Sequence, residues 1–268
     1  MILISDYYCR LNDYEELLRC LGKDESLGAE LAIFTDEHKP GFSGRLIDMK
    51  SRFAGRPVSF HGPHKDVEAS ASKDSPEGAK FINSFDKAFD ICRAYGARYI
   101  VAHTNNRGFS EGMRGALQAQ AGEAITLLYK LADLKEVTLL VENVGESGEG
   151  TELFREKEFV SFFEAIPGAA ALFDVGHAYL NGWDMEYVMH ELGSRIKACH
   201  LHNTDGISDN HFPFFAGKID AEEVLRLIKR YTPGADLVLE YAPAENVTSA
   251  LVLSDAKRIA GILKEKQQ

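Results

Sequence analysis

Six side chains that can bind a metal ion stand at the ends of short apolar runs in this sequence. They are His61 in VSFHGP, His103 in YIVAHT, Glu142 in LLVENV, Asp174 in ALFDVGH, His202 in CHLHN and Glu240 in LVLEY. Charged and imidazole groups beside apolar strands are costly to bury unless they pair or share a metal. They recur at intervals of about one strand plus one helix. A barrel of parallel strands gathers its strand C-termini at one face, so we predict that these groups converge there.

The chemistry of these donors indicates a divalent cation. The last four form a mixed set of oxygen and nitrogen ligands that suits Zn²⁺, Mn²⁺, Mg²⁺ or Co²⁺. Three more candidate ligands add to this set: His177 in DVGH and the pair Asp209 and His211. His200 precedes His202 by two residues, and we expect it one layer deeper, as a core histidine or as a support for the ligands.

Other polar and aromatic residues near the predicted mouth are candidates for substrate binding. They are His64, Arg107, Asn143, Trp183 and Lys218. Arg107 could bind an anionic group of the substrate, or it could be a solvated loop arginine. Trp183, together with Phe212, Phe214 and Phe215, could form a wall of the substrate site or simply cover the rim of the barrel.

The elements that must position these residues alternate along the whole chain. Apolar runs predict strands near 2–6, 29–34, 57–61, 98–103, 137–143, 170–175, 196–203 and 236–241, and apolar periodicity predicts helices at 75–95, 116–134, 220–231 and 247–265. Alternating strands and helices imply a parallel sheet. We predict one α/β domain over residues 1–268, a (β/α)₈ TIM barrel with the metal site at its C-terminal face. A doubly wound sheet is the alternative, but it predicts a glycine-rich loop after an early strand, and SDYYCRLND has no glycine.

Composition narrows the class of protein further. The chain has 268 residues, a formal net charge of −11 and four scattered cysteines, and no apolar run is long enough to cross a membrane. We expect a cytoplasmic, reduced protein without a signal peptide that acts on a small molecule. The negative charge disfavours nucleic acid as a partner. The outer ring of helices could support a homo-oligomer.

Five segments resemble the xylose isomerase-like TIM-barrel superfamily, which includes sugar-phosphate isomerases, sugar epimerases and endonuclease IV of AP endonuclease family 2. They are FHGPH at 60–64, YIVAHT at 99–104, LLVENVG at 139–145, FDVGHA at 173–178 and HLHNTDGISDNHFPFFAGKID at 200–220. The last is similar to a stretch found in members described as sugar-phosphate isomerases or epimerases. The resemblance spans nearly the whole chain and implies a barrel with a metal centre.

The resemblance also implies roles for individual residues. It implies a metal tetrad at Glu142, Asp174, His202 and Glu240. In the epimerase branch the two glutamates are also the acid–base pair, and the histidine at the position of His177 contacts substrate. Endonuclease IV implies a three-zinc site with nine ligands, and each has a counterpart here: His61, His103, Glu142, Asp174, His177, His202, Asp209, His211 and Glu240.

The sequence departs from both branches. The segment NTDGIS lacks the arginine that ketose epimerases carry a few residues after the seventh-strand histidine. Phe215-Ala216-Gly217 stands where many relatives have Gly-x-Gly. The loops after the first two strands are short and not basic, unlike a surface that grips DNA.

These observations favour one function over three others. We expect a metal-dependent isomerase or epimerase of a small sugar, sugar phosphate or related keto acid, in which a metal stabilises an enediolate and glutamates transfer the proton. A multi-zinc phosphoesterase is the first alternative, and a metal-dependent dehydratase is the second. A non-catalytic barrel with a structural metal is disfavoured, because structural sites are usually closed by cysteine and histidine.

Overall fold

Eight parallel strands form a closed barrel in the computed structural model, which describes residues 1–9, 14–22, 24–146, 148–166 and 168–265. Each strand pairs with the next along the chain, and the first pairs with the last. The strands are β1 (Ile2–Ser5), β2 (Leu27–Ala32), β3 (Val58–His61), β4 (Ile100–His103), β5 (Leu139–Glu142), β6 (Ala170–Asp174), β7 (Ile196–Leu201) and β8 (Asp236–Leu239). The predicted (β/α)₈ architecture is confirmed.

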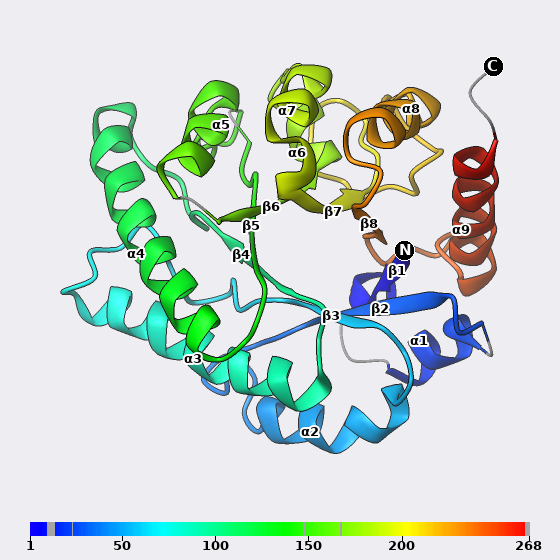
Figure 1. The fold of residues 1–268 in the computed structure, drawn as a ribbon, viewed down its shortest axis with the longest axis horizontal. Helices are drawn as coiled ribbons and strands as arrows, with labels where there is room; N and C mark the ends of the chain where they lie inside the picture. The colour runs from blue at the N-terminus through cyan, green and yellow to red at the C-terminus, as the bar shows by residue number, and fades with distance from the viewer. Residues whose placement is uncertain (10–13, 23, 147, 167, 266–268) are drawn as a thin grey trace.

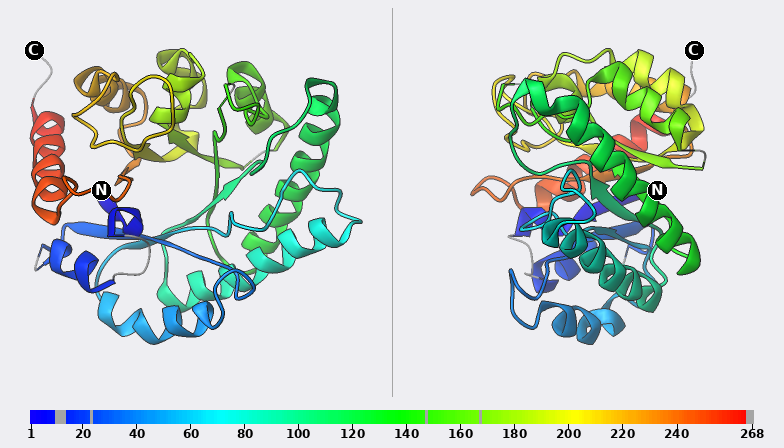
Figure 2. Two further views of the ribbon diagram at one scale, coloured as in Figure 1. Left: turned by 180° about the vertical axis from the view of Figure 1, so that it is seen from behind. Right: turned by 90° about the vertical axis from the view of Figure 1, so that its left-hand side faces the viewer.

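Helices surround the strands as an outer ring (Figures 1 and 2). The α-helices are α1 (Tyr14–Leu21), α2 (Phe42–Met49), α3 (Pro76–Tyr95), α4 (Arg114–Leu134), α5 (Glu156–Ala165), α6 (Val175–Leu180), α7 (Met185–Leu192), α8 (Ala221–Tyr231) and α9 (Ser249–Lys264). Short 3₁₀ segments are η1 (Asp6–Cys9), η2 (Lys50–Phe53), η3 (Glu111–Met113) and η4 (Gly193–Arg195). Helices α1 and α9 lie side by side and close the ring (Figure 1).

The predicted elements match the observed ones to within about two residues, with one systematic difference. The last residues of several predicted strands leave the barrel ladder, so that β7 ends at Leu201 and β8 at Leu239. His202 and Glu240 therefore lie just beyond their strands, where the backbone turns into the loops of the mouth. The helices α3, α4, α8 and α9 were predicted; α1, α2, α5, α6 and α7 were not, because most are too short to show a clear apolar period.

The alternation of side chains along each strand carries the polar residues to the mouth. Six apolar residues form a buried cluster separate from the main core: Tyr99, Val101, Leu140, Ala170, Leu172 and Ala198. Successive side chains on a strand point to opposite faces, so the next interior position lies two residues further on. From Val101, Leu140 and Leu172 that step leads to His103, Glu142 and Asp174. The interior is therefore apolar low in the barrel and polar at its C-terminal end.

An ion-pair cluster lies at the other end of the barrel. The carboxylate of Asp236, at the start of β8, accepts hydrogen bonds from Arg98 at 2.6 Å and 3.2 Å and lies 3.2 Å from the amino group of Met1. Asp236 is buried. This carboxylate belongs to the scaffold and is remote in the barrel from the polar layer.

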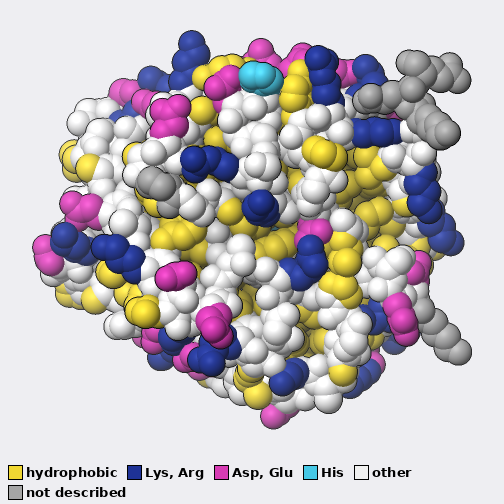
Figure 3. Space-filling model, viewed as in Figure 1, with side chains coloured by type: hydrophobic (Ala, Val, Ile, Leu, Met, Phe, Trp, Pro, Cys, Tyr) yellow, Lys and Arg dark blue, Asp and Glu magenta, His cyan; other side chains and the backbone are white. Residues whose placement is uncertain are grey.

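The outer surface carries both signs of charge. On the face in Figure 3, Lys and Arg side chains are interspersed with Asp and Glu. This face therefore offers no continuous basic surface for a phosphate backbone. Among the described residues, every helix is too short or too polar to cross a lipid bilayer.

Candidate active site

A polar pocket of about 270 Å³ lies at the C-terminal mouth of the barrel. Its lining comprises Ser5, Tyr7, Ala32, His61, His64, Lys65, His103, Glu142, His177, Asp209, His211 and Glu240. A groove of about 870 Å³ adjoins it and shares the lining residues His64, Lys65, His103, His177 and Asp209. The mouth therefore has room for a small molecule, with further space beside it.

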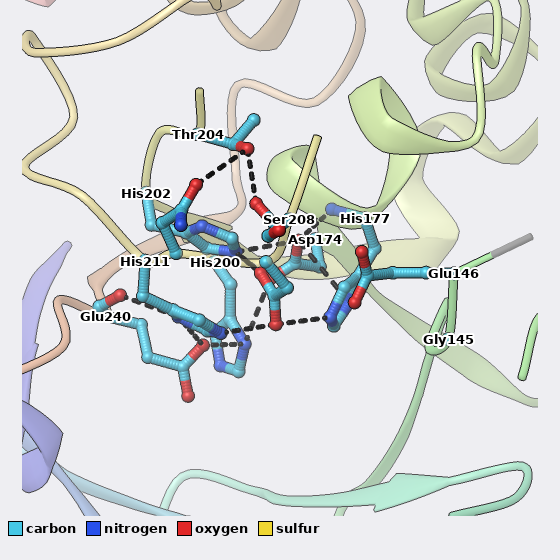
Figure 4. Close-up of polar contacts among 12 residues, drawn as sticks. Gly145, Glu146, Asp174, His177, His200, His202, Thr204, Ser208, His211 and Glu240 are labelled. Atoms are coloured by element: carbon cyan, nitrogen blue, oxygen red, sulfur yellow. Dashed lines mark hydrogen bonds and ion pairs between the residues drawn. The ribbon is translucent and has the colours of Figure 1, made fainter. Parts of the chain in front are cut away.

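Three carboxylates, at or just beyond the ends of three strands, lie near one buried imidazole nitrogen. The Nδ1 atom of His200 lies 3.1 Å from Glu240, 3.5 Å from Glu142 and 3.7 Å from Asp174. Figure 4 shows the His200, Asp174 and Glu240 side chains directed toward a common region. We call Glu142, Asp174, His200 and Glu240 the central group. Carboxylate oxygens and an imidazole nitrogen around one point form a donor set that suits a divalent cation.

The resemblance implies His202 as the imidazole of this group, whereas in the structure the imidazole among the three carboxylates is that of His200. The structure places Nε2 of His202 3.0 Å from both carboxylate oxygens of Asp174 and 3.8 Å from Asp209, and His202 has a ring nitrogen within 4.8 Å of ligand atoms of His211 and Glu240. We therefore propose His200 as the imidazole of the central group and His202 as a neighbour of Asp174 and Asp209. Sequence alone could not decide, because the two histidines are two residues apart, a spacing that places both on the same side of an extended strand.

A second group lies on the β3–β5 side of the pocket. The Nε2 atoms of His61 and His103 are 3.0 Å apart, and Glu142 approaches them at 3.7 Å and 3.3 Å. We call His61, His103 and Glu142 the His61 group; its ligand atoms lie within 4.8 Å of one another. Glu142 thus faces both this group and the central group, so it could bridge two ions.

A third group lies on the opposite side, between α6 and the loop after β7. The Oδ2 atom of Asp209 is 2.9 Å from Nε2 of His211 and 3.3 Å from Nε2 of His177. We call His177, Asp209 and His211 the Asp209 group. Asp174 places His177, because its side chain caps α6 by accepting a 2.7 Å hydrogen bond from the His177 backbone N–H. All nine side chains expected from the sequence to bind metal thus lie within or directly beside these three groups.

Electrostatics couple the carboxylates to the imidazoles. Burial alone would raise the pKa of Glu142, but the neighbouring His200 and His103 hold it well below its usual value. Burial opposes ionisation of Glu240 too, yet His200 and His211 lower its pKa to about 2. Nearby carboxylates raise the pKa of His211 to about 9 against the effect of burial. Without a cation, protons on the imidazoles balance the buried carboxylates; a bound cation would displace those protons.

The pKa values of His61 and His64 are lowered, whereas that of His211 is raised. Burial and neighbouring imidazoles lower the pKa of His61 and hold the pKa of His64 well below its ordinary value. Both rings are therefore neutral at pH 7, the form in which a histidine binds a metal or accepts a proton.

Unpaired buried atoms test whether these groups fit metal ions. Within the described part of the chain, Oε2 of Glu142, Nδ1 of His200 and Oδ1 of Asp209 are buried and have no hydrogen-bond partner. A buried polar atom without a partner costs roughly 1–3 kcal/mol, more if it is charged. Cations bound at the central group and at the Asp209 group would satisfy these three atoms. The donor set and these unpaired atoms therefore fit divalent cations.

Two of the five predicted substrate residues lie where a substrate could reach them. His64 lines both the pocket and the groove. Arg107 lines the groove, but its guanidinium already donates a 2.9 Å hydrogen bond to Glu77 and lies 3.7 Å from Glu68.

The structure does not bring Asn143, Trp183 and Lys218 to the pocket. Both polar atoms of the Asn143 side chain bond the backbone of Asp174, at 2.7 Å and 2.9 Å, so this amide fixes β6 beside β5. The indole of Trp183 is buried against Phe159 and donates to Glu152. Lys218 is absent from the described lining residues of pocket and groove. These three side chains lie outside the described lining of the pocket, and their substrate roles stay predictions.

Sequence reasoning missed Tyr7, Lys65 and Glu30. Tyr7 and Lys65 line the pocket from loops whose course depends on the fold. Glu30 bonds His200 from the middle of β2. A signal for Glu30 was present, because it is a lone charged residue in the apolar run LGAELA.

Gly176 provides a test of the packing behind the site. A Cβ atom at this position would lie 1.9 Å from Cε1 of the buried His202 ring. We expect Gly176→Ala to lower the free energy of unfolding by roughly 1–3 kcal/mol, as overpacking does in other cores. Urea denaturation measures this. In the control Gly261→Ala, the added methyl meets no atom within 4 Å in α9, so the variant should be as stable as the wild type or more so. Equal stability of both variants would contradict this packing.

Asp6 gives rise to a pH-dependent prediction. Its carboxyl is buried, accepts one hydrogen bond from the Ala32 backbone, and has an unpaired Oδ2. Burial, with a contribution from Glu30, raises its pKa to about 8. An acid whose folded-state pKa is raised stabilises the protein fully below its unfolded pKa, and this contribution is lost as the pH rises toward 8.

We therefore expect Asp6→Asn to be more stable than the wild type at pH 8, by an amount on the order of 3 kcal/mol, and to gain much less at pH 5. Urea unfolding of both metal-free proteins at the two pH values measures the difference. The same gain at pH 5 and pH 8 would show that Asp6 does not titrate in this range.

A barrel with a buried ring of carboxylates and imidazoles at its mouth defines the class of this protein, and comparisons with known proteins agree. The chain belongs to the xylose isomerase-like TIM barrel family, whose sequence model matches residues 32–256. A search of curated protein sequences found no match.

Solved structures share the fold at low sequence identity. A D-tagatose 3-epimerase-like protein has a TM-score of 0.80 at 15% identity, covering 98% of this chain and 97% of that one. The IolI protein with a bound zinc atom has 0.78 at 16%, covering 98% and 97%. The TTHB071 protein from Thermus thermophilus, soaked with ZnCl₂, has 0.73 at 21%, covering 99% of each chain. At these identities the likeness shows the fold alone.

Proposed function

We propose that this protein is a divalent-metal-dependent isomerase or epimerase of a small polyhydroxylated substrate. One observation carries the proposal: two buried glutamates, Glu142 and Glu240, line the same pocket and lie 3.5 Å and 3.1 Å from the same nitrogen of His200. Two carboxylates that face one small pocket can remove a proton from carbon and return one to it. Similarity to epimerase structures supports this reading.

The central group would hold the cation, which would polarise a substrate carbonyl next to the reacting carbon. Low pKa values keep Glu142 and Glu240 ionised at pH 7, so that either can accept a proton. His177 lies between Asp209 and Glu142 and lines the pocket. Its imidazole can donate a hydrogen bond to a substrate hydroxyl. Transfer from one face of the carbon and return on the other gives epimerisation; return to the neighbouring carbon gives isomerisation.

Proton exchange with solvent tests this proposal. The zinc- or manganese-loaded protein, incubated in D₂O with a panel of ketoses, ketose phosphates and keto acids, should place deuterium on a carbon next to the carbonyl of at least one of them. NMR or mass spectrometry detects the label. Absence of exchange across the panel, in a sample shown to contain metal, would refute the isomerase proposal.

Metal-assisted phosphoester hydrolysis is a second candidate. The observation that favours it is the presence of the His61 group and the Asp209 group beside the central group, which makes room for more than one ion. Several ions can activate water and stabilise a leaving oxygen. Release of phosphate or alcohol from a panel of phosphoesters, without carbon–proton exchange, would support hydrolysis instead.

A further inference from the structure

Glu30 is a buried carboxylate below the pocket that the proposed chemistry does not use. It lies in the middle of β2, is completely inaccessible to solvent, and is absent from the described pocket lining. Its Oε1 atom is 2.8 Å from Nε2 of His200, and its Oε2 atom accepts a 3.2 Å hydrogen bond from Ser59. Glu30 and Ser59 are register partners on adjacent strands, which fixes this arrangement in the barrel.

We propose that Glu30 is a positioning residue that prepares His200 to bind the cation, an inference that rests on the proposed metal-dependent function. His200 has one nitrogen on Glu30 and the other among the three carboxylates of the central group. A carboxylate that accepts the proton of Nε2 leaves the lone pair of Nδ1 directed at the mouth. Such support fixes the tautomer and ring orientation of a metal ligand and makes it more basic.

The burial of Glu30 argues against a purely structural role. A buried ionic pair generally contributes no more stability than apolar residues of the same volume. The neighbouring interior layer is apolar, and such a residue would suit a scaffold better than a charge. Because Glu30 does not reach the pocket, it acts through His200 and not on the substrate.

Cation affinity tests the inference. In Glu30→Gln the amide can present its NH₂ group to Nε2, which stabilises the wrong tautomer. We expect the Kd for Zn²⁺ at the central group to rise roughly 10- to 100-fold, as measured by competition with a chelator. The matched control is Asp236→Asn, which also removes a buried carboxylate but at the opposite end of the barrel. Its Kd should equal that of the wild type even if its stability falls.

Two spectroscopic measurements separate positioning from folding. The visible spectrum of bound Co²⁺ reports the ligands, and it should change in Glu30→Gln and not in Asp236→Asn. Nitrogen-15 NMR of the zinc-loaded wild type, with the His200 signal assigned, should show the proton on Nε2 and the metal on Nδ1. The second measurement needs no variant and holds even if Glu30→Gln does not fold.

The possible outcomes separate a failure of the role proposed for Glu30 from a failure of the proposed metal-dependent function on which that role rests. Unchanged zinc affinity and an unchanged cobalt spectrum in folded Glu30→Gln, or a proton on Nδ1 of His200 in the zinc-loaded wild type, would overturn the role of Glu30 alone. Failure of the wild type to bind any divalent cation would overturn the proposed function and this inference with it.

Discussion

Replacement of Glu142 by glutamine is expected to lower turnover by roughly 10³-fold or more while the barrel stays folded. Glu142 faces both the His61 group and the central group, and it is one of the two carboxylates proposed to move the proton. Glutamine has nearly the same shape but cannot accept a proton, and it is a poor metal ligand. Steady-state kinetics on the substrate found by deuterium exchange, with far-UV circular dichroism, measures both effects.

The matched control for this variant is Glu164→Gln, which changes an exposed glutamate on α5. It should leave turnover within about twofold of the wild type, since surface substitutions away from the site have small effects. Full activity of Glu142→Gln would remove the acid–base pair from the proposal. Unfolding of that variant at room temperature would assign Glu142 to the scaffold instead.

Divalent cations should raise the melting temperature of the metal-free protein by roughly 10 °C. A ligand that binds only the folded state stabilises it by about 4 kcal/mol at a free concentration a thousandfold above its Kd, and a chain of this size gains roughly 2–4 °C per kcal/mol. Co²⁺ should bind more tightly than Mn²⁺, because nitrogen and oxygen sites follow that order. Differential scanning calorimetry after chelation and reloading measures the shift.

Two variants test whether the shift in melting temperature comes from a cation at the central group. Asp174→Asn removes a carboxylate from the central group and should abolish most of the shift. Glu37→Gln removes a carboxylate that pairs with Lys80 at the surface and should retain it. A melting temperature that no cation changes, in a protein free of residual metal, would contradict metal binding at the mouth.

The fold could be predicted from the sequence because each strand is a short, doubly buried apolar run. A run such as LLVE in β5 stands out against polar flanks, and eight such runs separated by helices permit few topologies. Helix α6 was missed for a physical reason: it has six residues, too few for a period of 3.6 to be seen. Where strands end was also less certain, because barrel geometry and not composition decides where the ladder stops.

The types of residue at the site could be predicted from the sequence. The depth of each residue in the barrel could not. Residues at the strand ends, such as His103 and Glu142, lie close together as expected, because the parallel strands of a barrel all end at one face. The depth of His200 and His202 depends on how neighbouring strands are staggered, which a single sequence does not reveal. Trp183 lies outside the described lining of the pocket, because a tryptophan in a loop can equally pack under the mouth, as this one does against Phe159.

The most direct test of the whole account is a crystal structure of the zinc-loaded protein with anomalous diffraction data. It should show an ion at the mouth with Glu142, Asp174, His200 Nδ1 and Glu240 about 2.0–2.2 Å away. The number of ions, one or more, would also weigh isomerisation against phosphoester hydrolysis. A protein that crystallises from zinc with no ion among these four residues, or with His200 turned away from it, would contradict the account.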